Sequence, residues 1–276
     1  MRIEVTDSPV LFGERAGELL AARLEHNVLA TALMSVRATP HDHPGALFAW
    51  VEQRGSVVAA ALRTPPRRMV ATVMDAAIAE ALMTCWLGAD PELPGVVGPQ
   101  HAAAALAAAW ERLAAGRARL SEHEALYELE RVVAPARPAP GRLRAAAAGE
   151  RELLVRWWVA FGEEAGAFAG DAEHAVDRVM RRGGLFVWED AGPVSMLGLN
   201  PAVAGAVRVG PVYTPPEHRN RGYASSAVAA VSEMALAGGA RRCALFADLA
   251  NPTANRIYQA LGYERRGDWQ AFEFGP

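Results

Sequence analysis

Three residues stand where a strand would turn into a helix, and their spacing suits them to holding a phosphate group. Arg219, Gly222 and Ala224 have the spacing R-x-x-G-x-A, between an apolar run that ends at Thr214 and an apolar-periodic segment. The first N–H groups of a helix have no partner within it, and the helix dipole makes them partly positive. Gly222 would let the backbone approach an anion, and Ala224 would keep the next contact small. The pattern therefore predicts a phosphate-binding loop, with the backbone N–H groups of residues 221–225 as direct donors.

A second pattern lies further along the chain, again where a strand leads into a helix. The run CALFADL reads as a strand, and NPTANRIYQALGY follows it. Asn251 is placed to cap this helix, with Pro252 at the favoured first helical position. Asn255 and Tyr258 share one stripe of the helix with Asn251, so all three could face one ligand. Capping is the alternative role for Asn251, and core packing is the alternative for Tyr258.

In this order, the two motifs resemble the acyl-CoA-binding core of the GNAT acetyltransferase superfamily. Its signature Q/R-x-x-G-x-G/A lies between the fourth strand and the next helix, and N-P-x-A-N-R-x-Y-x-x-L-G-Y is similar to its later motif. The resemblance covers roughly residues 185–276 and implies acetyl-CoA as the co-substrate. It implies that the pantetheine arm pairs with the end of the strand as an added strand would. The implied cofactor-binding residues are Val212, Tyr213, Thr214, Arg219, Asn220, Arg221, Gly222, Tyr223, Ala224, Ser225, Asn251 and Asn255.

The resemblance also implies a reaction. A deprotonated primary amine attacks the acetyl carbonyl, and Tyr258 protonates the thiolate of CoA as it leaves. Holding the two bound reactants in line would account for most of the reduction of the activation barrier, and the general acid would accelerate the reaction by a further factor of about 10²–10⁴. The residues do not identify the base: Asp248, Glu163 and Glu164 are all candidates. Glu217 is expected to shape the loop instead.

Composition and charge exclude several classes of protein. The chain has 276 residues, enough for two domains, and 51% of them are hydrophobic, with a mean hydropathy of +0.04. No apolar run is long enough to cross a bilayer, and the segment MRIEVTDSP lacks the basic stretch of a signal peptide. A net charge of −3 and a pI near 6.2 argue against a nucleic-acid partner. We expect an amine acceptor, a small molecule or a peptide; the sequence sets no oligomeric state.

The positions of the cysteines and histidines indicate neither a disulfide framework nor a metal site. With Cys85 and Cys243 alone, no disulfide framework is indicated, and a cytoplasmic location is expected. Cys243 lies in a predicted strand and is interpreted as buried packing, not as a nucleophile that carries the acyl group. His41 and His43 are interpreted as part of a polar turn between two prolines, so we predict no metal site.

The chain contains a pseudo-repeat. LFAWVE begins at Leu47 and LFVWED at Leu185, an offset of 185 − 47 = 138, which is half of 276. Each is followed by a second strand, and each half has a later V-G-P step, at residues 97–99 and 209–211. We interpret this as a duplication, and the proline-rich segment Pro135 to Arg142 as a linker. The predicted domains are therefore residues 1–137 and 138–276.

The first half lacks the features that bind the cofactor in the second. After its V-G-P step a helix begins at once, and Ala103 stands where the motif has glycine if Gln100 takes the first position. The segment EHEALYELERVV reads as a strand, with Tyr127 a strand residue. We therefore predict a degenerate copy without a cofactor site.

The predicted fold class is α/β (α+β), with two GNAT-like domains, each a mixed, mainly antiparallel sheet flanked by helices. The predicted function is acetyl-CoA-dependent N-acetylation by the second domain. A non-enzymatic module that binds acyl-CoA is one rival, and a nucleotide-binding regulator that uses the same anion loop is another.

Overall fold

The computed structural model describes residues 1–165 and 171–276, which divide into two compact units. Unit 1 comprises Met1–Glu124 and Gly267–Pro276, and unit 2 comprises Ala125–Arg266. This division differs from the expected one at residues 137 and 138, because the proline-rich segment is packed inside unit 2. Ala139 donates its N–H to Ser226 Oγ (2.8 Å), and Trp188 donates its indole N–H to the Pro140 carbonyl (2.8 Å). The proline-rich segment is therefore packed within unit 2 and is not a linker between the two units.

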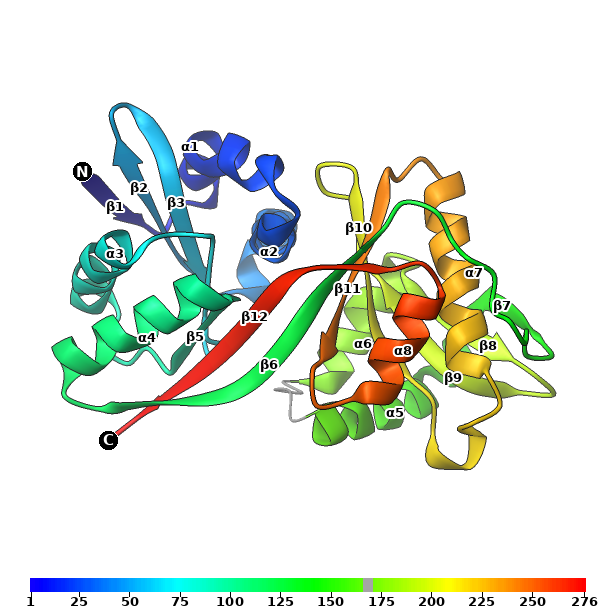
Figure 1. Cartoon of the computed structure of the whole chain (residues 1–276). Helices are drawn as coiled ribbons and strands as arrows, with labels where there is room; N and C mark the ends of the chain where they lie inside the picture. The colour runs from blue at the N-terminus through cyan, green and yellow to red at the C-terminus, as the bar shows by residue number, and fades with distance from the viewer. Residues whose placement is uncertain (166–170) are drawn as a thin grey trace. The chain divides into compact units, whose positions relative to one another are not determined.

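Unit 2 is a mixed sheet with helices on both faces (Figure 1). Its strands have the order β11-β10-β9-β8-β7, with β10 and β11 parallel and the other neighbours antiparallel. The strands expected at LFVWED, before Thr214 and at CALFADL are present, as are the helices expected after the last two. The elements are β7 (Arg142–Ala145), α5 (Arg151–Ala165), α6 (Ala172–Arg181), β8 (Leu185–Glu189), β9 (Pro193–Leu199), β10 (Ala206–Tyr213), α7 (Tyr223–Ala237), β11 (Arg242–Asp248) and α8 (Pro252–Ala260).

Two apolar clusters fill the two faces of this sheet. Val228 and Val231 of α7 pack with Tyr258 and Leu261 against strand residues that include Val207. On the other face, the α5 and α6 cluster includes Trp157 and Val176 of the helices with Met196 and Tyr213 of the strands. The C-terminal end of β10 therefore lies between two packed helical layers, which fix its position.

Unit 1 has a sheet of the same kind. Its strand order is β1-β2-β3-β4-β5-β12, and β4 and β5 are parallel. Its core contains Leu82, Met83 and Trp86 of α3 with Leu106 of α4. The elements are β1 (Arg2–Thr6), α1 (Pro9–Ala22), α2 (Asn27–Ala38), β2 (Leu47–Gln53), β3 (Ser56–Arg63), β4 (Met69–Ala71), α3 (Ala76–Ala89), β5 (Gly95–Pro99) and α4 (Gln100–Ala114). Strands β6 (Arg117–Leu129) and β12 (Glu264–Gly275) each contribute residues to both units.

The two units repeat one order of elements, so the structure supports a duplication but changes its alignment. Helices α3 and α7 begin 223 − 76 = 147 residues apart, and strands β5 and β11 begin 242 − 95 = 147 residues apart. Residues 97–99 lie in β5, which pairs in parallel with β4 as β11 does with β10. The first V-G-P step thus corresponds to β11, and its match to residues 209–211 was wrong. The counterpart of the predicted phosphate-loop helix is α3, not α4.

Candidate functional site

The sheet of unit 2 opens between β10 and β11. The register of these strands contains three pairs, from Ala206↔Arg242 to Arg208↔Ala244, although β10 continues to Tyr213 and β11 to Asp248. On its other side, β10 shifts register against β9 between Val209 and Val212. The shift bends β10 where its pairing with β11 ends. Backbone groups on both sides of the opening are therefore placed to pair with an extended ligand.

Two carbonyl groups at the end of β10 already have partners. The Tyr213 carbonyl accepts from Ser195 Oγ (2.9 Å), and the Thr214 carbonyl accepts from Arg219 Nε (2.9 Å). Ser195 Oγ also lies 2.9 Å from Thr214 Oγ1. These bonds hold the strand end in place. Of the three residues expected to pair with pantetheine, Val212 keeps its carbonyl clear of such side-chain bonds within the described part of the chain.

The predicted phosphate loop leads into α7 as a left-handed turn. Asn220 has φ 61°, and Gly222, the N-cap of α7, has φ 80°. No side chain of the described residues caps the helix. Within residues 1–165 and 171–276, the N–H groups of Tyr223, Ala224 and Ser225 donate no hydrogen bond. Three convergent N–H groups at a helix start form an anion-binding arrangement.

The structure gives a second reason for the glycine at position 222. A Cβ built there would lie 3.4 Å from the Arg137 carbonyl oxygen and 3.7 Å from Ala139 Cβ. That side of Gly222 faces the proline-rich segment, and the expectation that the missing Cβ lets the backbone approach an anion stays a prediction. The positive φ is the requirement, because residues with a Cβ rarely adopt it.

The two arginines of the loop have different surroundings. Arg219 Nη2 donates to both carboxylate oxygens of Glu164, at 2.8 and 2.6 Å. Arg219 therefore shapes the loop. Arg221 is exposed, and no carboxylate of the described residues forms an ion pair with it. The Tyr223 ring is buried, and its hydroxyl donates to Asp190 Oδ2 (2.5 Å).

The second motif begins as its residues predict. Asn251 caps α8, with its side chain accepting from the Ala254 N–H at 3.0 Å. Asn255 lies one turn later and donates its side-chain N–H groups to the Asp248 and Asn251 carbonyls, both at 2.7 Å. Asn255 Oδ1 accepts from the Tyr127 hydroxyl (2.8 Å). These bonds fix the turn between β11 and α8, and a cofactor contact by Asn255 stays a prediction.

Tyr127 was missed as a neighbour of the site. Sequence reasoning placed it in a strand, which is confirmed, but in the first half of the chain. It belongs to unit 2, and its ring centroid lies 6.3 Å from that of Tyr258. No local motif marks Tyr127, because its position depends on the strand β6 reaching unit 2.

Tyr258 combines burial with an unpaired hydroxyl. It is 9% exposed and lies beside the rings of Tyr127 and Tyr263. Burial raises the pKa of Tyr258 to about 12, so the hydroxyl keeps its proton at neutral pH. Burial is the sole cause of this shift, and no hydrogen bond of the hydroxyl within the described part of the chain contributes to it. The proton is therefore available to a bound ligand.

The candidate bases differ in their exposure and in the hydrogen bonds and ion pairs that their carboxylates already form. Glu164 is held by Arg219 and accepts from the Tyr213 hydroxyl at 3.3 Å. Glu163 and Glu217 are exposed. Asp248 is exposed at the end of β11, beside the opening, and uses Oδ1 to accept from the Ala250 N–H (2.8 Å). Among the three candidates Asp248, Glu163 and Glu164, Asp248 ends the strand that borders the opening.

Cys243 is fully buried in β11, and burial raises the pKa of its thiol to about 11. A protonated, inaccessible thiol does not act as a nucleophile.

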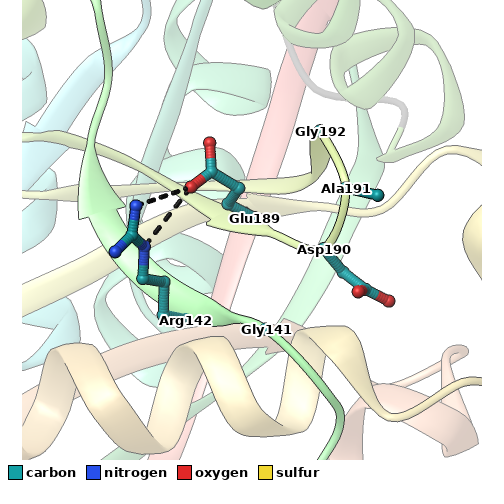
Figure 2. Close-up of a pocket in the computed structure, with 6 residues that line it drawn as sticks. All are labelled: Gly141, Arg142, Glu189, Asp190, Ala191 and Gly192. Atoms are coloured by element: carbon teal, nitrogen blue, oxygen red, sulfur yellow. Dashed lines mark hydrogen bonds and ion pairs between the residues drawn. The ribbon is translucent and has the colours of Figure 1, made fainter.

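A surface hollow of about 620 Å³ is lined by Gly141, Arg142, Glu189, Asp190, Ala191 and Gly192 (Figure 2). It lies at the turn between β8 and β9 and includes none of the expected site residues.

The comparisons with known proteins identify this part of the chain. Residues 151–263 match the model of the acetyltransferase (GNAT) family. This segment is a GNAT domain. Proteins of this family are acetyltransferases, and acetyl-CoA is their acyl donor. No curated protein matches the sequence significantly.

Solved structures share the fold over the whole length. A GCN5-related N-acetyltransferase from Sphaerobacter thermophilus has a TM-score of 0.61 and 15% identity, covering 98% of this chain and 94% of its own. A tandem GNAT protein from the clavulanic acid biosynthesis pathway has a TM-score of 0.60 and 16% identity, with 100% and 99% covered. A GNAT acetyltransferase from Colwellia psychrerythraea has a TM-score of 0.57 and 12% identity, with both chains covered completely. At these identities the likeness concerns the fold, which here is the tandem GNAT form.

The GNAT domain fits acetyl-CoA in its chemistry. The strand opening, the three N–H groups at the start of α7 and the unpaired Tyr258 hydroxyl match the peptide-like arm, the pyrophosphate and the sulfur of the donor. In the described ranges, no helix has the length and apolar character needed to span a membrane.

Proposed function

We propose that unit 2 binds acetyl-CoA at the opening between β10 and β11 and transfers its acetyl group to a primary amine by direct attack. The loss of pairing after Arg208 and Ala244 carries this proposal. An interrupted ladder leaves backbone donors and acceptors that an extended amide chain can satisfy. Unsatisfied groups in a sheet interior are costly, so the opening is best explained by a ligand.

Each part of the site has a role in this proposal. The N–H groups of Tyr223, Ala224 and Ser225 hold the pyrophosphate, and Arg221 adds positive charge beside it. Tyr258 donates a hydrogen bond to the sulfur as the thiolate leaves. The acceptor amine must arrive deprotonated or lose a proton at the site. Asp248 is the carboxylate that we assign to that step, directly or through a water molecule.

We also propose that unit 1 binds no acetyl-CoA. Its β4 and α3 are joined by residues 72–75, whereas β10 and α7 are joined by residues 214–222. The start of α3 is closed by Asp75, whose carboxylate accepts from the Ile78 N–H (2.8 Å). The Val73 N–H donates to His26 Nε2 at 3.3 Å. One of the donors that would meet a phosphate is thus already used, and the Asp75 carboxylate would repel the anion.

Titration calorimetry and a free-thiol assay test the proposal. Calorimetry with acetyl-CoA, CoA and ATP should show binding of the two CoA compounds and not of ATP. Tight binding of ATP alone would indicate a nucleotide-binding regulator. Release of free CoA with an amine library should then identify an acceptor class. Binding without turnover across chemically diverse amines would favour a non-enzymatic sensor of acyl-CoA.

A further inference from the structure

We propose that Glu164 is a positioning residue for the acyl donor, acting through Arg219. The inference rests on the proposed function of unit 2 and adds a component to it. Glu164 lies on α5, outside both motifs, and it fixes the loop that precedes α7. Arg221 and the N–H groups of α7 are then left to meet the pyrophosphate.

The contacts around Arg219 join three segments of unit 2. Its Nη2 reaches both oxygens of Glu164, at 2.8 and 2.6 Å, and its Nε reaches the Thr214 carbonyl at 2.9 Å. The guanidinium lies 5.8 Å from the centroid of the Tyr213 ring, and the Tyr213 hydroxyl donates to Glu164 Oε1 (3.3 Å). One guanidinium thereby links the end of α5, the end of β10 and the loop itself.

This arrangement restricts the loop before any ligand arrives. The bond from Arg219 back to Thr214 closes residues 214–219 into a ring, and Glu164 keeps the guanidinium in that orientation. A loop that is ordered in advance loses less conformational entropy when it binds. Without Glu164, Arg219 could turn toward solvent, and the three N–H groups of α7 would converge less often.

The two arginines of the loop also differ in whether a carboxylate neutralises their charge. Glu164 neutralises Arg219, so the positive charge that remains on the loop belongs to Arg221. The side chains of Arg219 and Glu164 are 41% and 48% exposed. Exposed pairs contribute little to folding stability. The pair should consequently affect ligand affinity more than the unfolding transition.

Acetyl-CoA titration calorimetry on the full chain tests this, with Glu164→Ala, Arg219→Ala and the double variant. Glu152→Ala, on the same helix and without an ion pair in the described residues, is the control. We expect Glu164→Ala to weaken acetyl-CoA binding about three- to tenfold, and Glu152→Ala to leave it unchanged. Because both residues act through one contact, the double variant should be no weaker than Arg219→Ala alone. In turnover, KM for acetyl-CoA should rise while kcat stays within about twofold.

The outcomes separate the inference from the function beneath it. Wild-type affinity in Glu164→Ala, or additive losses in the double variant, would overturn the positioning role while acetyl-CoA binding by the wild type stands. A wild-type chain that binds no acetyl-CoA would overturn the proposed function, and the positioning role with it. If Glu164→Ala fails to fold, by circular dichroism, Glu164→Gln replaces it, since Gln keeps the shape and loses the charge.

Discussion

Replacing Tyr258 by Phe separates chemistry from packing more cleanly than other substitutions in the site. The change removes a hydroxyl whose pKa is shifted by burial alone, with no hydrogen bond from the described residues, and it keeps a ring that is 9% exposed. No buried partner is left unsatisfied, so stability should not fall. Acetyl-CoA affinity should also remain close to that of the wild type, because binding relies on β10 and the start of α7.

The expected loss of turnover follows from the pKa of the tyrosine. Burial raises that pKa to about 12, whereas a thiol has a pKa of about 8.5. Complete proton transfer to the departing thiolate is therefore uphill, and a hydrogen bond to the developing charge is the larger effect. Such a bond is worth about 1.5–3 kcal/mol, which corresponds to about 10- to 100-fold in kcat. This is lower than the 10²–10⁴-fold that a matched general acid would give.

The assay is release of free CoA at saturating acetyl-CoA and acceptor, with affinity measured by calorimetry. Tyr127→Phe is the matched control, since it removes the hydroxyl that donates to Asn255 Oδ1 at 2.8 Å. Tyr127→Phe should lower the free energy of unfolding by about 1–3 kcal/mol and leave kcat almost unchanged. An unchanged kcat in Tyr258→Phe, or an equal loss in both variants, would reduce Tyr258 to a packing residue.

Three further predictions concern the loop, the number of sites and the response to pH. Gly222→Val should abolish measurable acetyl-CoA binding, because a β-branched residue does not accept φ 80°; calorimetry at wild-type affinity would show that the loop assignment is wrong. The intact chain should bind one acetyl-CoA, and a titration stoichiometry near two would mean that unit 1 binds the donor despite Asp75. Stability should fall as pH rises above 10, because the unfolded Tyr258 ionises there while the folded one stays protonated until about pH 12. Tyr258→Phe should lose less stability than the wild type between pH 10 and 12 in chemical denaturation, and parallel curves would contradict the burial of its hydroxyl.

Local chemistry made much of unit 2 predictable. Asn251 and Pro252 mark the start of a helix through capping and a fixed φ, which depend on neighbours in sequence. The strand-turn-helix at Gly222 is equally local. The roles of individual side chains were harder to predict from the sequence. Whether Arg219 faces a phosphate or Glu164 depends on the packing of α5 against β10, which lies outside the motif.

Long-range pairing explains the errors. The V-G-P match joined residues 97–99 to residues 209–211 because three small or apolar residues recur easily in a chain rich in such residues. Strand direction decides the alignment, and it is visible only once β4 and β5 are seen to run parallel. Tyr127 was assigned to the wrong half for a related reason, since β6 crosses from one unit to the other.

The return of β12 to unit 1 has a consequence for synthesis on the ribosome. Residues 269–273 pair with residues 95–99 of β5, but they are translated after all of unit 2. The intervening 266 − 124 = 142 residues take roughly 7–30 s at ordinary elongation rates. During that interval β5 is an uncovered sheet edge, a template for pairing with other chains. Unit 1 thus cannot complete its sheet until unit 2 has been synthesised.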